Sequence, residues 1–369
     1  MGCINSTQET NHPNSIEKIH ISNSVEKIQF SSIISSIQCI PLQEPEQALL
    51  ADSWKVRIHK NLIYQYSLTS LSINIFDNEG KHVSTIDSRS QGRVTYPVDF
   101  IINEQHGELW VLDDKRTIKR YNLSGKDYKG AINLPTPAVS LTQIQNGEIL
   151  VYDGNFNRNG NKYITLLDVN STKNVSYGPQ KTNKRINQNI PATLFTSNSK
   201  GTTYTLMPLN DTIYITKPNE NKYFEPHYHL DFNGKYLTET IWPDKGFTDK
   251  EYHKLIISGN IAYNINSFYY AAQRLFFSPK GLNNAYYAIE TNNNKLVCFT
   301  SLFDGIKPST PATSIQGSTD SALLFIFSAS ELLNHYRNRN FETEHYEIKS
   351  LLQNVDNTNQ QILIICNLK

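Results

Sequence analysis

Short hydrophobic segments alternate with turn-forming polar residues along most of this chain, and one such pattern occurs twice. Ile73–Lys81 reads INIFDNEGK and Ile118–Lys126 reads IKRYNLSGK. In both copies an aromatic residue follows an isoleucine by three positions, and Asp or Asn then leads into a Gly-Lys turn. A strand that stops at a turn requiring a left-handed residue, and then restarts, predicts an antiparallel sheet.

The spacing of this pattern predicts a repeat architecture. The two aromatic residues, Phe76 and Tyr121, lie 45 positions apart, and a fainter copy, YITLLDVNSTK, places Leu167 another 46 positions along. A shifted fourth copy is LDFNGK at Leu230–Lys235. Periods of roughly 40 to 50 residues are typical of propeller blades, in which each unit buries its faces only against its neighbours.

Alternating apolar positions divide the first three repeats into four short strands each, as expected for a propeller blade. These strands are Trp54–His59, Leu62–Tyr66, Ser72–Phe76 and Val83–Ile86; Val98–Ile102, Glu108–Leu112, Ile118–Tyr121 and Ala131–Leu134; Leu141–Ile144, Ile149–Tyr152, Tyr163–Leu167 and Val175–Tyr177.

Later repeats are less regular. The fourth has expected strands at Thr203–Met207, Thr212–Ile215 and Tyr228–Phe232, and the fifth at Ile261–Ile265, Arg274–Phe277, Ala285–Ile289 and Lys295–Thr300. Helical spacing predicts a short helix at Thr248–Leu255 and two more at Ser328–Asn338 and Glu342–Asn354, within the last repeat. The predicted fold is all-β: a six-bladed propeller of four-stranded antiparallel blades with short helices in the last blade.

A ring of blades must be closed, usually by one blade that contains both ends of the chain. The expected partners are a strand at Val25–Phe30 and the apolar C-terminal segment Ile362–Leu368. The polar, non-periodic N-terminal segment predicts a flexible tether over residues 1–23, followed by the propeller over residues 24–369.

The Gly2-Cys3 pair at the start of the chain is similar to the end of a bacterial lipoprotein signal, whose cysteine becomes acylated. Cys3 is therefore the predicted lipidation site, and an accidental cysteine near a start codon is the alternative. Cys298 and Cys366 lie in apolar strand contexts and are expected to be buried thiols. No hydrophobic run reaches the ~18 residues that span a bilayer, so membrane attachment is expected only through the lipid.

The charge balance, 35 basic against 34 acidic residues, gives a net charge of +1. No basic stripe appears, so a nucleic-acid partner is not expected. We expect a monomer without a cofactor.

At this point the residues resemble a family, the six-bladed propeller lipoproteins of Bacteroidetes, which are related in shape to NHL-repeat and TolB-like propellers. The resemblance covers nearly the whole chain and rests on IPL, FDNEGK, YNLSGK, INLP, NDTIY and a Y-x-x-DF step at Tyr96–Phe100. The glycine-rich G-Q-G-P-G-E-Y turn of that family corresponds to Ser90–Tyr96, in which Gln91, Gly92 and Tyr96 are kept. The resemblance implies location in the cell envelope of a Gram-negative bacterium.

Enzyme and metal signals are weak. No nucleophile elbow, zinc-protease helix or phosphate loop occurs. Asp153, Asn155 and Asn157 mimic a calcium loop, but the sixth and twelfth positions do not fit. His227 and His229 share a strand face without a third ligand. A lactonase-like metal ring is left as an alternative, and its candidate ligands are ordinary turn residues as well: Glu108, Asp113, Asp114, Asp153, Asn210 and Asp211.

A binding function requires less: a rigid ring, variable loops and some exposed aromatic rings. The segment Ser267–Phe277 is rich in aromatic residues, and three tryptophans are scattered elsewhere. The predicted ligand-binding residues are Trp110, Tyr269, Tyr270 and Arg274, although packing between blades would use the same residue types. The predicted function is a non-enzymatic binding module for a carbohydrate-like or peptide-like ligand at one mouth of the central channel; a scaffold that binds another protein without a pocket is the remaining possibility.

Overall fold

The computed structural model describes most of the chain. The described residues are 16–22, 24–45, 53–145, 147–154, 162–167, 174–180, 195–238, 241–258, 261–262, 264–281, 285–299, 301, 314–338, 340, 345–353 and 360–369.

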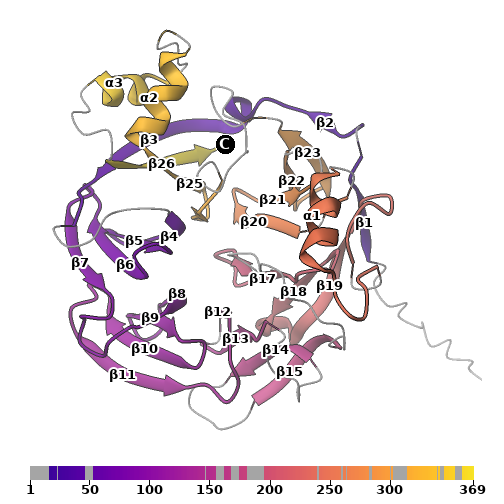
Figure 1. The fold of residues 1–369 in the computed structure, drawn as a ribbon, viewed down its shortest axis with the longest axis horizontal. Coiled ribbons are helices and arrows are strands. Elements are labelled where there is room, and N and C mark those ends of the chain that lie inside the picture. Colours follow the sequence, from indigo (N-terminus) through magenta and orange to yellow (C-terminus); the bar gives the residue numbers. More distant parts are fainter. Residues whose placement is uncertain are drawn as a thin grey trace, which may run out of the picture.

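Six sheets are arranged around a common centre, which confirms the predicted six-bladed propeller (Figure 1). Within each blade the four main strands are antiparallel. In Figure 1 the strands β4, β8, β12 and β20 surround the centre, whereas β7, β11 and β3 lie at the periphery. Most of the hydrophobic core lies between neighbouring blades, because each blade buries both faces against the next.

Blades one to three follow the predicted strand order closely, and each sheet runs from an innermost first strand to an outermost fourth strand. Blade one contains β4 (Ser53–His59), β5 (Leu62–Ser67), β6 (Ser72–Asp77) and β7 (His82–Ile86). Blade two contains β8 (Pro97–Asn103), β9 (Glu108–Asp113), β10 (Thr117–Asn122) and β11 (Tyr128–Asn133). Blade three contains β12 (Ser140–Gln143), β13 (Ile149–Tyr152), β14 (Lys162–Leu167) and β15 (Asn174–Gln180).

Blades four and five each have a fifth strand, which comes from the N-terminal segment and pairs in parallel with the outermost strand. Blade four contains β16 (Phe195–Ser197), β17 (Thr203–Leu206), β18 (Thr212–Lys217), β19 (Lys222–Asp231) and the added β1 (Glu17–His20). Blade five contains β20 (Asn264–Ala271), β21 (Arg274–Lys280), β22 (Tyr286–Glu290), β23 (Lys295–Phe299) and the added β2 (Glu26–Lys27).

Blade six closes the ring with strands from both ends of the chain, in the order β24 (Gly317–Ser318), β25 (Ala322–Ser328), β26 (Gln361–Leu368) and β3 (Ile34–Leu42). The predicted kind of closure is therefore confirmed, but the predicted N-terminal partner is wrong. The strand that pairs with β26 is β3, from Gln361 opposite Leu42 to Leu368 opposite Ile34. The long alternating segment ISSIQCIPL offers eight paired positions, many more than the short β2.

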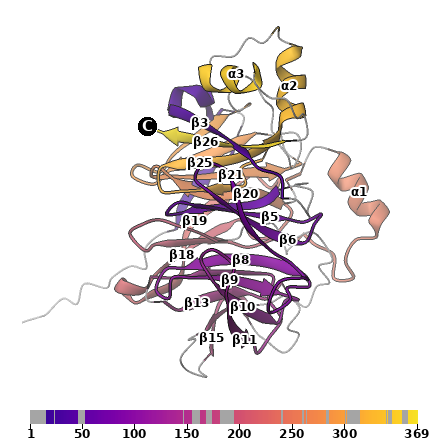
Figure 2. The ribbon, with the colours of Figure 1, turned by 90° about the vertical axis from the view of Figure 1, so that its left-hand side faces the viewer.

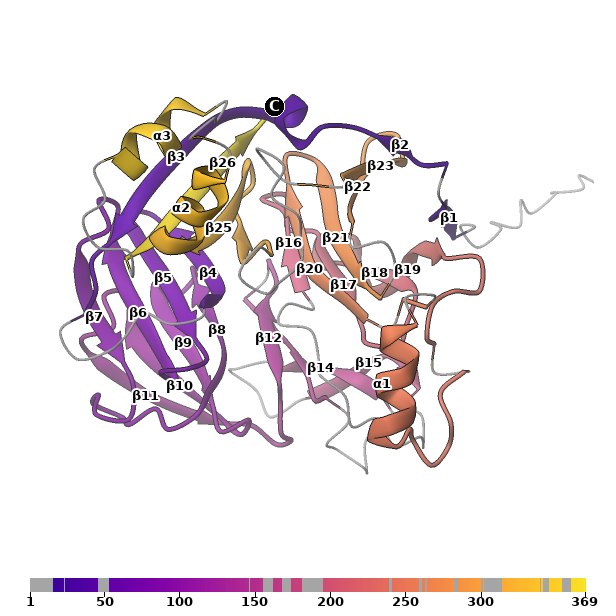
Figure 3. The ribbon, with the colours of Figure 1, turned by 45° about the horizontal axis from the view of Figure 1, so that its top comes forward.

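The N-terminal segment follows the outer rim of three blades in succession, as Figure 3 shows for β1, β2 and β3. Ile19 and Ile21 are buried in the core between blades four and five, so β1 is held by side-chain packing as well as by backbone pairing. The strand β1 lies within the range predicted as a tether, residues 1–23, so this part of that range belongs to the folded ring.

The described residues include three α-helices, α1 (Asp249–Ile257), α2 (Ala329–Arg337) and α3 (Tyr346–Gln353). They also include two short 3-10 helices, η1 (Phe30–Ile33) and η2 (Pro218–Glu220). The α-helices confirm the three predicted from sequence. Ser328 and Glu331 form a capping box at the start of α2, as a Ser-x-x-Glu pattern predicts. No helix in the described ranges is long and apolar enough to cross a membrane.

All three α-helices lie in connections on one side of the ring. Helix α1 lies between β19 and β20, and α2 and α3 lie between β25 and β26. Because strands alternate in direction within a blade, second-to-third connections and connections to the next blade emerge on the same side. Figure 2 shows α1 and α2 projecting on that side. We call it the helix-bearing face, and the opposite side the hairpin face.

The repeated Gly-Lys turn has a packing role. Gly80 and Gly125 both have positive φ, at 84° and 70°, and each turn contacts the preceding blade. A Cβ on Gly80 would lie 2.1 Å from the carbonyl oxygen of Pro41, and one on Gly125 would lie 2.5 Å from a methyl group of Ile75. Gly234 of the fourth copy also has positive φ but has no neighbour within 4 Å, because this copy follows an outermost strand and is not a turn of the same kind.

Candidate functional site

Polar side chains of the innermost strands join neighbouring blades at the wall of the channel. The ammonium of Lys55 on β4 lies 2.5 Å from the carboxylate of Asp99 on β8 and also donates to the Phe100 carbonyl. The other carboxylate oxygen of Asp99 accepts from the Ser140 hydroxyl and the Leu141 N–H of β12. Asp99 therefore connects blades one, two and three. Burial lowers the pKa of Lys55, while the Asp99 carboxylate acts in the opposite direction.

Similar contacts continue around the ring. The Tyr270 N–H of β20 donates to the Thr196 hydroxyl of β16 at 2.7 Å, and the Val56 N–H of β4 donates to the Gln316 carbonyl beside β24 at 2.8 Å. These polar groups are buried and already engaged. They hold the ring together and are not free to bind a ligand.

The hairpin face carries contacts that reach past a whole blade. The Ser199 N–H of blade four donates to the carboxylate of Asp320 in blade six at 3.0 Å. The Ala272 N–H of blade five donates to the Asp320 carbonyl at 2.6 Å. Hairpins of three blades thus meet on this face, close to the innermost strands.

The helix-bearing face, in contrast, exposes apolar side chains. Seven large hydrophobic side chains are exposed in the described part of the chain, and five of them belong to connections of this face: Leu68, Tyr96, Ile241, Ile257 and Tyr346. They belong to connections of different blades, so they are spread around this face and each must be considered by its own surroundings.

Tyr96 stands at the start of the innermost strand β8, on the helix-bearing side of the channel, and is 49% exposed. Its backbone is fixed. The Thr95 and Tyr96 N–H groups donate to one carboxylate oxygen of Asp113, at 2.9 and 2.7 Å, and the Tyr96 carbonyl accepts from the Asp114 N–H at 2.9 Å. The loop therefore holds the exposed ring on a rigid support.

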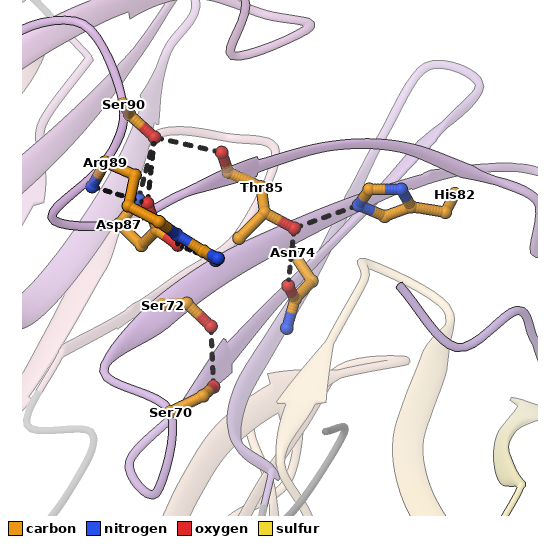
Figure 4. Close-up of polar contacts among 8 residues, drawn as sticks. All are labelled: Ser70, Ser72, Asn74, His82, Thr85, Asp87, Arg89 and Ser90. Carbon is orange, nitrogen blue, oxygen red and sulfur yellow. Dashed lines mark hydrogen bonds and ion pairs between the residues drawn. The ribbon is translucent and has the colours of Figure 1, made fainter. Parts of the chain in front are cut away.

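The same loop, residues 87–96, is anchored where it begins. Asp87 accepts from the Arg89 backbone and side chain and lies within reach of the Ser90 hydroxyl (Figure 4). Ser90 also donates to the Thr85 carbonyl, as Figure 4 shows. The hydrogen bonds and the ion pair with Arg89 hold the pKa of Asp87 below its usual value, against the effect of burial. The start of the loop is therefore tied to β7.

Of the three turn residues Gln91, Gly92 and Tyr96, the first two have structural roles. The Gln91 carbonyl accepts from the Tyr121 hydroxyl at 2.9 Å. Gly92, with φ of 83°, lies so close to the Tyr128 ring that a Cβ would be 2.5 Å from it. The third, Tyr96, presents its side chain to solvent. Sequence reasoning noted Tyr96 as part of the turn but did not select it as a binding residue; its position just before an innermost strand was the available signal.

The predicted aromatic binding residues are packed inside the ring. Trp110 has no exposed surface, and Tyr269 and Tyr270 are 2% and 8% exposed. Trp110 packs between blades two and three, and the Tyr270 ring stacks on Tyr204 of blade four. The structure thus places these rings where bulky residues fill the space between sheets, as the packing alternative described. Arg274 lies on the hairpin face, beside Glu290 and the Lys369 carbonyl.

The acidic residues of the lactonase-like alternative do not converge. Glu108 and Asp113 stand at opposite ends of β9, a separation of about 17 Å for a strand of this length. Asp113 is occupied by two N–H groups and by the Lys119 ammonium at 2.8 Å. Among the described residues no cluster of three or more His, Cys, Asp or Glu side chains could hold a metal. The asparagines of the calcium-like loop lie outside the described residues.

The two histidines of β19 have separate environments. His229 lies 3.3 Å from the Asp211 carboxylate. His227 packs against the rings of Tyr204 and Tyr228, and burial lowers its pKa. Each imidazole has its own local contacts.

The fold and the loop geometry define a six-bladed β-propeller with an aromatic side chain at one channel mouth. The family described as Domain of unknown function (DUF4934) matches residues 16–367, and the chain belongs to this family. The search of functionally curated proteins finds no match.

Three solved structures are similar to this chain at low sequence identity. A Bacteroides fragilis protein described as exported has a TM-score of 0.70 and 15% identity, covering 96% of this chain and 100% of that chain. A DUF4221 family member from Bacteroides vulgatus has a TM-score of 0.53 and 10% identity, covering 91% and 97%. Virginiamycin B lyase from Staphylococcus aureus has a TM-score of 0.43 and 14% identity, covering 79% and 81%. At these identities the likeness concerns the fold alone.

Proposed function

We propose that this protein is a binding module of the bacterial cell envelope that engages a carbohydrate-like or peptide-like ligand on the helix-bearing face, at the channel mouth beside Tyr96. The observation that carries the proposal is the combination of an exposed ring and a fixed backbone at Tyr96. Because the loop backbone is already fixed, a ligand that stacks on the ring does not have to order that backbone.

The distribution of polar groups supports binding in preference to catalysis. The charged groups buried at the channel wall, Lys55 and Asp99, satisfy each other and the backbone of the next blades. The exposed groups on the helix-bearing face lie on loops, where ligand contacts vary most readily on a constant scaffold.

The experiment compares variants of the full chain on arrays of neutral and charged glycans and of peptides. The Tyr96→Ala variant is expected to bind the array ligand about tenfold more weakly than the parent, since an aromatic contact contributes roughly 1 kcal/mol or more. Tyr346→Ala is the matched control, because Tyr346 is an exposed tyrosine of α3 on the same face. Equal losses in both variants, or no loss in Tyr96→Ala, would remove the channel mouth as the site.

The envelope location rests on two supports. The similar Bacteroides fragilis protein is described as exported, and Cys3 stands in a lipoprotein-like position. Cys3 itself lies outside the described residues. Expressed with its native signal, a Cys3→Ser protein should appear in the soluble fraction while the parent stays with membranes. Membrane retention of Cys3→Ser would argue against a lipid anchor at this position.

Ligand binding should be independent of divalent metal ions. The loops around Tyr96 supply a ring, hydroxyls and charged side chains, and Asp113 is already saturated with donors. Exhaustive treatment with a chelator is expected to leave binding unchanged. Binding that is lost on chelation and restored by calcium or zinc would instead favour the lactonase-like alternative.

A further inference from the structure

The loop 87–96 and the adjoining turn 113–116 carry more positive charge than their own acidic residues neutralise. Asp87 is paired with Arg89, and Asp113 is paired with Lys119. After these pairs are formed, Arg93 of the loop and Arg116 of the turn remain exposed. Within the described residues neither guanidinium has an ion pair or a hydrogen bond. The other charged residues of these two segments are the acidic Asp114, which is exposed, and the basic Lys115, which is half-buried.

Backbone hydrogen bonds connect the loop that carries Arg93 with the turn that carries Arg116. The Arg93 N–H donates to the Ser90 carbonyl at 2.9 Å, and the Arg93 carbonyl accepts from the Lys119 ammonium. The turn that carries Arg116 is joined to the loop through the bond from Asp114 to Tyr96. Two unpaired guanidiniums are thus carried by the same rigid unit as the exposed Tyr96 ring.

The backbone of this unit offers no pairing site for an extended peptide. The N–H groups from Arg93 through Tyr96 are engaged within the protein, as is that of Asp114. A peptide that binds by strand addition needs a row of free backbone groups. Recognition here must use side chains: one flat ring, two guanidiniums, the Thr95 hydroxyl and the Asp114 carboxylate. This set suits a sugar that has an apolar ring face, hydroxyl groups and a negative charge.

We propose that the channel mouth beside Tyr96 binds acidic oligosaccharides that contain uronic acid residues. The pyranose ring stacks on Tyr96, and its carboxylate accepts two parallel hydrogen bonds from a guanidinium, with Arg93 as the principal partner. The inference rests on the proposed function and narrows its ligand to an anionic glycan. Since the guanidiniums are exposed, the attraction is screened by salt.

The test measures binding of the full chain to short oligosaccharides of galacturonate, glucuronate and mannuronate by calorimetry, with the methyl ester of each as its neutral counterpart. The free acid is expected to bind about tenfold more tightly than its ester, since charge-assisted bidentate pairs are the stronger ones. Arg93→Ala should remove most of this preference, and Arg93→Lys should keep part of it, because lysine keeps the charge but not the planar fork. Arg337→Ala, at an exposed position of α2, is the matched control and should bind like the parent.

Four results would overturn the inference. Esters that bind as tightly as the acids would show that the charge is not recognised. An Arg93→Ala protein that keeps the full acid preference would place recognition elsewhere. A neutral glycan or a peptide that binds in a Tyr96-dependent manner, with no uronate binding, would leave the proposed function standing and exclude the acidic ligand. An array with no bound ligand of any kind would contradict both.

Discussion

The Lys55 ammonium and the Asp99 carboxylate, 2.5 Å apart, form a buried ion pair between the innermost strands of blades one and two. Because Asp99 also accepts from Ser140 and Leu141, it holds three consecutive blades. Asp99→Ala would leave a buried ammonium without its partner. We expect a loss of about 3 to 5 kcal/mol in the free energy of unfolding, measured by urea denaturation.

The control for this prediction is Glu79→Ala, since Glu79 is an exposed acidic residue of blade one. A double variant, Lys55→Met with Asp99→Leu, should recover much of the lost stability, because removing both charges leaves no unpaired group. An Asp99→Ala protein that unfolds at the same urea concentration as the parent would show that the pair contributes little.

Gly80 and Gly234 provide a matched comparison, because both have positive φ, 84° and 72°, but only Gly80 approaches a neighbouring blade. Gly234→Ala should cost about 1 kcal/mol for the left-handed backbone alone. Gly80→Ala should cost clearly more, about 3 kcal/mol, because its methyl group would overlap the Pro41 carbonyl. Thermal unfolding of both variants measures the difference in stability. If both variants lose the same stability, the contact between Gly80 and the neighbouring blade accommodates a methyl group without an energetic penalty.

Ring closure can be tested by two truncations. Removing residues 361–369 deletes β26 from the middle of blade six and should abolish cooperative unfolding, since β25 and β3 would both lose their partner. Removing residues 1–28 deletes only the added strands β1 and β2. This second protein should keep a cooperative transition at a lower temperature, because Ile19 and Ile21 leave the core. If the first truncation melts like the parent, the shared blade does not hold the ring.

Buried tyrosines predict a loss of stability at alkaline pH. Burial raises the pKa of Tyr228 and Tyr287 from the ordinary 10.0 to about 12, and it also raises the pKa of Tyr64 and Tyr204. Above pH 10 the unfolded chain releases these protons while the folded chain retains them. Stability is therefore complete below pH 10 and falls as pH rises toward 12. The urea midpoint should be lower at about pH 11.5 than at about pH 8, and phenolate absorbance should rise as the chain unfolds at the higher pH. An unchanged midpoint would contradict the prediction.

Much of the fold could be predicted from the sequence because its determinants are local. Asp77 and Asn122 each cap a tight turn with their own side-chain oxygen, so the repeated motif specifies its turns without help from distant residues. The same holds for the helix after Ser328, where the cap and its partner Glu331 lie three positions apart. Regular alternation then gives the strand count of each blade.

The closing strand could not be chosen by local pattern. Val25–Phe30 and Ile34–Leu42 both offer apolar residues at strand-like spacing, and only docking of the whole segment along the rim decides that β3 pairs with β26 while β2 adds to blade five. The two segments differ in which strand lies beside them in the folded ring. Which strand that is depends on the position that the segment reaches along the outer rim of the ring.

The candidate site illustrates the same limit. The sequence by itself determined that aromatic residues are abundant and that a Gln-Gly turn precedes Tyr96, but aromatic residue types serve cores and binding surfaces alike. Tertiary packing buried Trp110 and Tyr269 between blades and left Tyr96 exposed at the channel mouth. Burial is a property of neighbours brought together from distant parts of the chain, and only the closed ring of six blades supplies those neighbours.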